Sequence, residues 1–260
     1  MNQSYFVINS DDRDKVNYPD PSDYKVVGND QSFSAENVGS LEATEFSMYY
    51  DVPNINLRNN VMLVDDGGSS YPLTVKEGFY THATLATALQ VELILALGAG
   101  QSVVFDPVKQ RYTMTTTVPI KYVKYPLQVR DLTDVMGFNK NKPLSLVNVS
   151  GSSDLVYTRN IYVKSNSIHR SKTIQDQSTT SILTDLLMTV PIYESGSLVS
   201  EPQQIAYQVS WPKKIYVNSQ DRISSFDLQL LDDQGEHLYN PNVGLNTWKY
   251  HINIIATKGV

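Results

Sequence analysis

Residues 72–97 read PLTVKEGFYTHATLATALQVELILAL, and this stretch carries the clearest helix signal in the 260-residue chain. Four leucines spaced four apart would form one apolar stripe: Leu85, Leu89, Leu93 and Leu97. Thr81 predicts an N-cap, because its hydroxyl can accept from a free backbone N–H of the first turn. Gly98 and Gly100 predict the end of the helix, which therefore runs over about 81–97.

Three further aliphatic residues fall on the other faces of this helix: Val91, Ile94 and Leu95. They leave its second half apolar nearly all round, and a helix of that kind is normally buried. We therefore expect the second half to be enclosed. Because the rest of the chain indicates β-structure, we expect the helix to be an inserted element packed against a β-barrel.

Short runs of alternating apolar and polar residues, separated by turns rich in Gly, Asn, Asp and Pro, make up most of the remaining sequence. Loops, rather than regular crossover helices, join these runs, which favours an antiparallel sandwich. The jelly roll is the sandwich that best accommodates about eight strands with long end loops. The predicted fold class is all-β: an antiparallel jelly-roll β-sandwich with one inserted α-helix and an extended N-terminal arm.

The predicted domain organisation has two parts. Residues 1–40 hold one short apolar run, two closely spaced prolines and a polar Gly/Asn/Gln/Ser segment, which indicates an extended arm. Residues 41–260 are expected to form a single jelly-roll domain. Three polar insertions are predicted within it, near 139–153, 165–180 and 193–221.

Composition excludes several classes of protein. The formal net charge of −6 argues against nucleic acid as the main partner, since phosphate binding needs a basic field. The absence of cysteine removes disulfides, thiol nucleophiles and Cys-ligated zinc. No apolar run is long enough to predict a membrane span, and the N-terminus lacks a signal-peptide pattern. Seventeen tyrosines suit either half-buried strands or protein–protein interfaces.

Residue types that support catalysis or metal binding are present without a recognisable spacing. The four histidines lack patterns such as H-x-x-x-H: His82, His169, His237 and His251. Three aspartate clusters are best explained by turns: Asp11-Asp12-Asp14, Asp65-Asp66 and Asp232-Asp233. The chain has no nucleophile elbow or P-loop, and nothing selects a carboxylate pair for glycoside cleavage. We expect a non-enzymatic protein with no catalytic residue, cofactor or metal ion.

Several segments, in order, resemble the single jelly-roll vertex proteins (pentons) of large icosahedral double-stranded DNA viruses and their virophages. They are FVINSDDRD at 6–14, YPDPSDYKV at 18–26, VKEGFYTHATLATALQVEL at 75–93, SVVFDPVKQRYTMTT at 102–116, LTDVMGFN at 132–139, ILTDLLMTVPI at 182–192, ISSFDLQLLDDQGEHL at 223–238 and WKYHINIIA at 248–256. The chain departs from the family at Glu77, where Pro is favoured, and at Met136, where Leu is favoured.

The resemblance implies a structural virion protein: a penton capsomer whose homopentamer closes the five-fold vertices of an icosahedral capsid. It implies contacts with the neighbouring major capsid protein, and with other minor capsid proteins through the N-terminal arm. Direct nucleic-acid binding is not expected. The implied location is the capsid vertex of the virion, after assembly in the cytoplasm of the host cell.

Two alternatives remain open. One is a different minor capsid, cement or fibre-like component of the virion. The other is a carbohydrate-binding jelly-roll attachment module or glycosidase, for which Trp211 and Trp248 are candidate binding residues. Core packing is the more ordinary explanation for both tryptophans.

Overall fold

The structure is a computed structural model that describes residues 3–27, 38–165, 186–192, 201–216, 225–240 and 249–258. The chain divides into two compact units. The first, called the sandwich unit, comprises Met1–Val52, Thr158–Ser197 and Pro202–Val260. The second, called the inserted unit, comprises Pro53–Tyr157 and Leu198–Glu201. Residues 41–260, expected from the sequence to form one domain, are thus shared between these two units, and the middle of the chain builds a core of its own.

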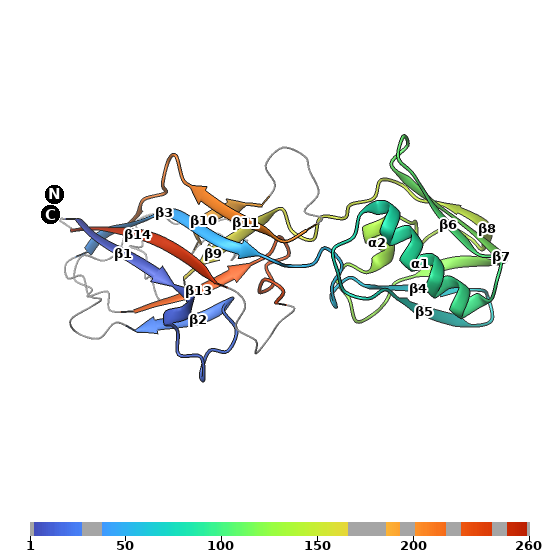
Figure 1. Ribbon diagram of the computed structural model, residues 1–260, viewed down its shortest axis with the longest axis horizontal. Helices are drawn as coiled ribbons and strands as arrows, with labels where there is room; N and C mark the ends of the chain where they lie inside the picture. The colour runs from blue at the N-terminus through green and yellow to red at the C-terminus, as the bar shows by residue number, and fades with distance from the viewer. Residues whose placement is uncertain are drawn as a thin grey trace. The chain divides into compact units, whose positions relative to one another are not determined.

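Two antiparallel sheets make up the sandwich unit (Figure 1). The first has the order β1 (Gln3–Asn9), β14 (Tyr250–Lys258), β3 (Val38–Tyr50) and β11 (Gln203–Gln208). The short strand β12 (Ile215–Tyr216) also pairs with β3. The second sheet has the order β10 (Leu186–Pro191), β9 (Asn160–Lys164), β13 (Ser225–Leu231) and β2 (Asp23–Val27).

These strands follow the order of a jelly roll. β11 and β12 pair with different parts of β3 and therefore share one strand position. Counted in this way along the sandwich unit, the first sheet holds the first, eighth, third and sixth strands, and the second holds the fifth, fourth, seventh and second. This distribution is the jelly-roll arrangement, which confirms the predicted fold class. The inserted unit occupies the connection between β3 and β9.

The N-terminal residues belong to the sandwich. β1 pairs along its whole length with β14, and β2 pairs with β13. Phe6 and Ile8 of β1 are buried in the core. Within the expected extended arm of residues 1–40, the two strands β1 and β2 are thus part of the sandwich sheets, and their pairing partners lie near the other end of the chain. Residues 28–37 of the expected arm lie outside the described residues.

Arg13 holds the connection between β1 and β2. Its buried guanidinium donates to the backbone carbonyls of Ser10, Tyr18 and Pro19, at 2.6, 3.0 and 3.2 Å. The planar fork of arginine presents several donors in fixed directions, which suits this task better than the single ammonium of lysine. The arginine of the SDDRD segment therefore orders the polypeptide between the two sheets.

The inserted unit has its own sheet, built from β4 (Val61–Asp65), β5 (Ser70–Thr74), β6 (Ser102–Asp106), β7 (Arg111–Val123) and β8 (Ser145–Val149). The strand order is β5-β4-β7-β6, and β8 pairs with β7. Helix α1 (His82–Leu97) lies across this sheet and contacts β5, β6 and β7 (Figure 1). The short helix α2 (Leu132–Met136) contacts β4 and β7. The core between helices and sheet belongs to the inserted unit.

Both ends of α1 agree with the sequence prediction. The Thr81 hydroxyl accepts from the Thr84 backbone N–H at 3.3 Å, and the Thr84 hydroxyl accepts from the Thr81 N–H at 2.9 Å. This reciprocal capping box satisfies two N–H groups that the first turn leaves free. At the other end Gly98 has a positive φ of 86°, which ends the helix.

Burial of α1 is one-sided. Leu85, Leu89 and Leu93 are fully buried against the sheet of the inserted unit. Leu95, by contrast, is 76% exposed, and Val91 is 52% exposed. The expectation that the second half of this helix is enclosed is therefore wrong for the single chain, because the sheet covers only one face.

Two of the three predicted polar insertions contain strands. The segment 139–153 includes β8, and the segment 193–221 includes β11 and β12, which together fill the sixth strand position of the jelly roll. The segment 165–180 lies outside the described residues beyond Ser165.

Buried amide side chains fix the start of the inserted unit, where the sequence reads PNINLRNN. Asn54 donates to the Tyr80 carbonyl at 2.7 Å and accepts from the Tyr80 N–H at 2.8 Å. Asn60 donates to the Val75 carbonyl at 3.0 Å, and Gln128 donates to the Asn60 side chain at 2.9 Å. A satisfied buried network of this kind makes one backbone conformation strongly preferred.

Candidate assembly surfaces

The histidines are placed on separate elements. His82 begins α1 and stacks on Phe105 with ring centroids 4.3 Å apart, while its Nδ1 lies 3.0 Å from the Tyr112 hydroxyl oxygen. Burial lowers the pKa of His82, so the neutral ring is favoured. His237 pairs with β13 beside a turn, and His251 is exposed on β14. His169 lies outside the described residues.

The aspartate clusters act in turns, as the sequence predicts, but Asp233 also accepts from the Arg159 N–H and Asp11 pairs with Lys249, both in distant segments. The Asp66 carboxylate accepts from the N–H groups of Gly68 and Ser69 at 2.9 and 2.7 Å, and these bonds lower its pKa. Asp232 accepts from the N–H groups of Gln234 and Glu236 at 2.9 and 3.0 Å. Among the described residues, no group of three or more His, Cys, Asp or Glu side chains could hold a metal ion.

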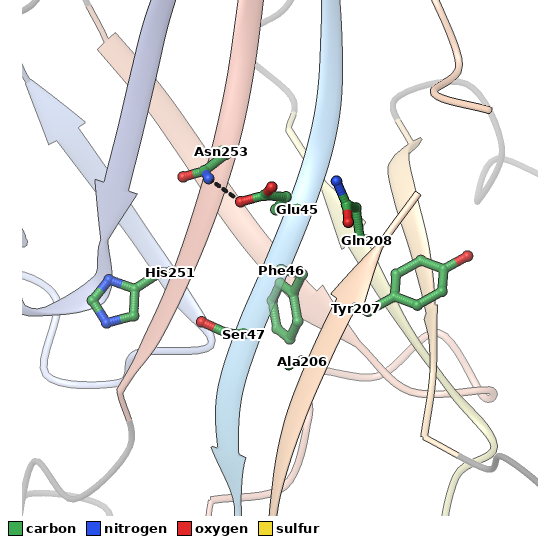
Figure 2. A pocket seen from close by; sticks show the side chains of 8 residues that line it. All are labelled: Glu45, Phe46, Ser47, Ala206, Tyr207, Gln208, His251 and Asn253. Carbon is green, nitrogen blue, oxygen red and sulfur yellow. Dashed lines mark hydrogen bonds between the residues drawn. The ribbon is translucent and has the colours of Figure 1, made fainter. Parts of the chain in front are cut away.

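An open hollow of about 350 Å³ lies on the outer face of the first sheet of the sandwich unit (Figure 2). Strands β3, β11 and β14 supply its lining: Glu45, Phe46, Ser47, Ala206, Tyr207, Gln208, His251 and Asn253. The Asn253 amide donates to the Glu45 carboxylate. This lining can exchange hydrogen bonds with a polar ligand. It contains a single carboxylate, whereas hydrolysis of a glycosidic bond ordinarily uses two.

Exposed apolar groups mark the first sheet and a loop of the sandwich unit. β1 is the edge strand of this sheet, and its outward side chains Tyr5 and Val7 are 69% and 67% exposed. Trp211, in the connection between β11 and β12, is 92% exposed. The expectation of core packing is therefore wrong for Trp211, and Trp248 lies outside the described residues. Exposed aromatic side chains and strand edges are common contact points between proteins.

The abundant tyrosines are divided between core and surface. Four of them rank among the largest fully buried or nearly fully buried side chains: Tyr24, Tyr112, Tyr122 and Tyr250. Burial raises the pKa of each well above the ordinary value, so all four hydroxyls stay neutral at physiological pH. The high tyrosine content is therefore explained in part by packing in the cores of the two units, in addition to any role at interfaces.

The described geometry defines a jelly-roll β-sandwich protein that carries an inserted, helix-covered sheet and displays exposed strand edges and apolar side chains. None of the helices in the described part of the chain has the length and apolar character needed to cross a membrane. Sequence reasoning missed the surfaces of β1 and α1, because exposure depends on which neighbours cover a side chain.

Comparison with known structures identifies the same fold. The mavirus penton protein matches over 99% of this chain and 100% of its own, with a TM-score of 0.56 and 13% sequence identity. A structure of the Sputnik virophage matches over 99% of this chain and 98% of that chain, with a TM-score of 0.45 and 11% identity. No protein-family model and no curated protein sequence matches the chain. The resemblance to penton proteins predicted from the sequence is thus confirmed at the level of the fold.

Proposed function

We propose that this chain is a structural protein of a virus particle, and specifically a penton capsomer whose homopentamer closes the five-fold vertices of an icosahedral capsid. The observation that carries the proposal is the full-length likeness in fold to the mavirus penton protein. The likeness spans both units, and hence more than the jelly roll that many unrelated proteins share.

The surfaces of the molecule are consistent with an assembly role. A ring of identical subunits needs two different contact surfaces on each copy, since its interfaces are heterologous. The exposed apolar side chains of both units supply candidate contacts. The acidic net charge of −6 favours protein neighbours, such as the major capsid protein and other minor capsid proteins, over direct contact with the genome. We propose that the protein is assembled into virions in the cytoplasm of the host cell.

Measurement of mass in solution tests the pentamer. We expect purified full-length protein to show a species of five times 29.2 kDa by light scattering or native mass spectrometry, with a population that rises with concentration. Electron microscopy of the assembled particle should place the chain in density at the five-fold vertices. Monomers at high concentration, together with vertex density that the chain does not fit, would contradict the proposal.

A glycan-binding attachment role is the second candidate, and the exposed indole of Trp211 favours it. Sugar rings pack on aromatic faces while polar groups bind their hydroxyls. If this role is correct, Trp211→Ala should reduce binding to a glycan array at least about tenfold. Val16→Ala, at a position that is 90% exposed, is the matched control and should leave binding unchanged. An array on which the wild-type protein binds nothing would rule out this role.

A further inference from the structure

The outer face of α1 has an unusual composition for a helix in contact with water. Glu92 is its only acidic or basic residue apart from His82. The outer face is formed by six uncharged, exposed residues: Ala83, Thr84, Thr87, Val91, Ile94 and Leu95. A helix on the surface of a protein normally presents charged side chains to solvent. This face therefore has the composition of one that is covered in the functional state.

A second uncharged surface lies on the outer side of the inserted unit's sheet, where β6, β7 and β8 run side by side. Strand pairing places its residues in two rows, Val104–Thr113–Val149 and Ser102–Thr115–Val147. The three valines are 58%, 42% and 53% exposed, in the order Val104, Val149 and Val147. The sheet face that contacts water ordinarily carries polar and charged side chains. These two rows contain no charged residue.

The two surfaces lie on opposite sides of the inserted unit. Along β6 and β7, the alternate residues Val103 and Met114 are buried in the core that α1 covers. Because side chains alternate across a strand, Val104 and Thr113 point away from the helix. The outer face of α1 and the outer face of β6-β7-β8 are thus the two exposed sides of one helix-on-sheet layer (Figure 1).

We propose that the outer face of α1 in one copy of the chain packs against the outer face of β6-β7-β8 in the next copy. The proposal rests on the proposed function, since a capsomer brings several copies together. Val91 and Leu95 on the helix face, and the three valines on the sheet face, are all at least 42% exposed. A contiguous exposed apolar patch on a soluble protein is commonly a contact site. Stable interfaces bury roughly 1,200–2,000 Å² in total, so the two patches would form the apolar centre of a larger contact with a polar rim.

A second copy is the occupant that the chemistry favours. The two valine–threonine rows and the exposed positions of α1 are uncharged, and the charged pair Asp106–Arg111 lies at the end of the sheet face beyond them. A row of valine and threonine side chains suits the aliphatic ridge of a helix. A single unrelated partner would cover one surface and leave the other in water. A neighbouring copy on each side covers both, through the heterologous type of contact that generates rings.

Two charged double variants test the contact in the full chain. Val91→Lys with Leu95→Lys alters the helix face, and Val104→Lys with Val147→Lys alters the sheet face. Each should raise the dissociation constant for self-association at least about 100-fold, because lysine would have to be buried unpaired. Leu127→Lys is the matched control: this residue of the inserted unit is 81% exposed and lies on neither face. The control should associate as the wild type does.

Mixing the two double variants provides the decisive readout, because each keeps one intact surface. The mixture should form a 1:1 heterodimer, in which the intact helix face of one variant packs on the intact sheet face of the other, with no larger species. A misfolded variant could not restore association in this way. Thr87→Lys, on the exposed side of α1, is a milder second variant that should weaken self-association in the same direction.

The possible results separate the contact from the function. If both double variants associate as the wild type does, the proposed contact is wrong and the capsid role stands. If both are monomeric but their mixture is also monomeric, the pairing of these two faces is wrong. If the wild-type protein itself stays monomeric at high concentration, the proposed function loses its support together with the contact.

Discussion

Replacement of Gly137 by alanine is expected to lower the free energy of unfolding by at least about 4 kcal/mol. Gly137 ends α2 with φ 76°, in the left-handed region that alanine adopts only with strain. A Cβ at this position would clash with the backbone carbonyl oxygen of Ser152 and lie 2.9 Å from the carbonyl carbon of the same residue. The obstacle is backbone rather than the free end of a side chain, so a rotamer change cannot relieve it.

The surrounding hydrogen bonds prevent an easy backbone shift. The Gly151 N–H donates to the Gly137 carbonyl, and the Asp154 N–H donates to the Val135 carbonyl, both at 2.8 Å. Moving Ser152 away from a new methyl group would break these contacts between α2 and the following segment. Loss of buried backbone hydrogen bonds adds its own cost to the strain.

Gly98→Ala is the matched control for this substitution. Gly98 has a similar positive φ of 86°, but a Cβ built there meets nothing within 4 Å. Because its ψ is −176°, its cost should be limited to the backbone strain of that glycine-favouring region, about 1–3 kcal/mol. Urea denaturation of the full-length protein, with hydrogen exchange by mass spectrometry to locate the loss, measures both variants. Equal losses at the two glycines would show that the Ser152 backbone moves aside freely.

Leu89→Ala is expected to cost about 2–5 kcal/mol, because it removes a fully buried side chain from the middle of the inserted unit's core. The helix and the strands beneath it are each held by other contacts, so the cavity would close only in part. Hydrogen exchange should show the loss of protection in α1 and its sheet, while the sandwich unit keeps its own protection.

Leu127→Ala is the control for the same chemical change on the surface of the same unit. Its side chain is 81% exposed, so the expected cost is within about 0.5 kcal/mol of zero. A Leu89 variant as stable as the Leu127 variant would mean that α1 does not pack on the sheet as described.

Local patterns determined much of the inserted unit. The bounds of α1 follow from Thr81, the leucine spacing and Gly98, all of which act within a few residues of each other. The short helix ending at Gly137 and the aspartate turns follow for the same reason. The burial of α1 was predicted less well, because composition shows that a face avoids water but does not show what covers it.

Pairing between segments that are distant in the sequence decided the features of the fold that local patterns do not predict. β1 belongs to the sandwich because it pairs with β14, which lies near the other end of the chain. The short apolar run of β1 indicates a strand but does not indicate this partner. The sequence does not predict the inserted unit, because apolar and polar residues alternate in the same way before and after its boundaries. A domain boundary within such a β-rich chain has no distinct sequence pattern. The exposed surfaces of α1 and of β6-β7-β8 follow only from the tertiary structure, because strand pairing and helix packing decide which side chains are buried.

By itself, then, the sequence determined the fold class, the capped helix at residues 81–97, the turns and the absence of thiol chemistry. These features depend on residue type and on neighbours within about one helical turn or one hairpin. The tertiary structure alone decided that residues 3–27 belong to the two sheets of the jelly roll, that the middle of the chain is a separate unit, and that α1 is buried on one side only. Those outcomes depend on contacts between distant segments, which local spacing does not encode.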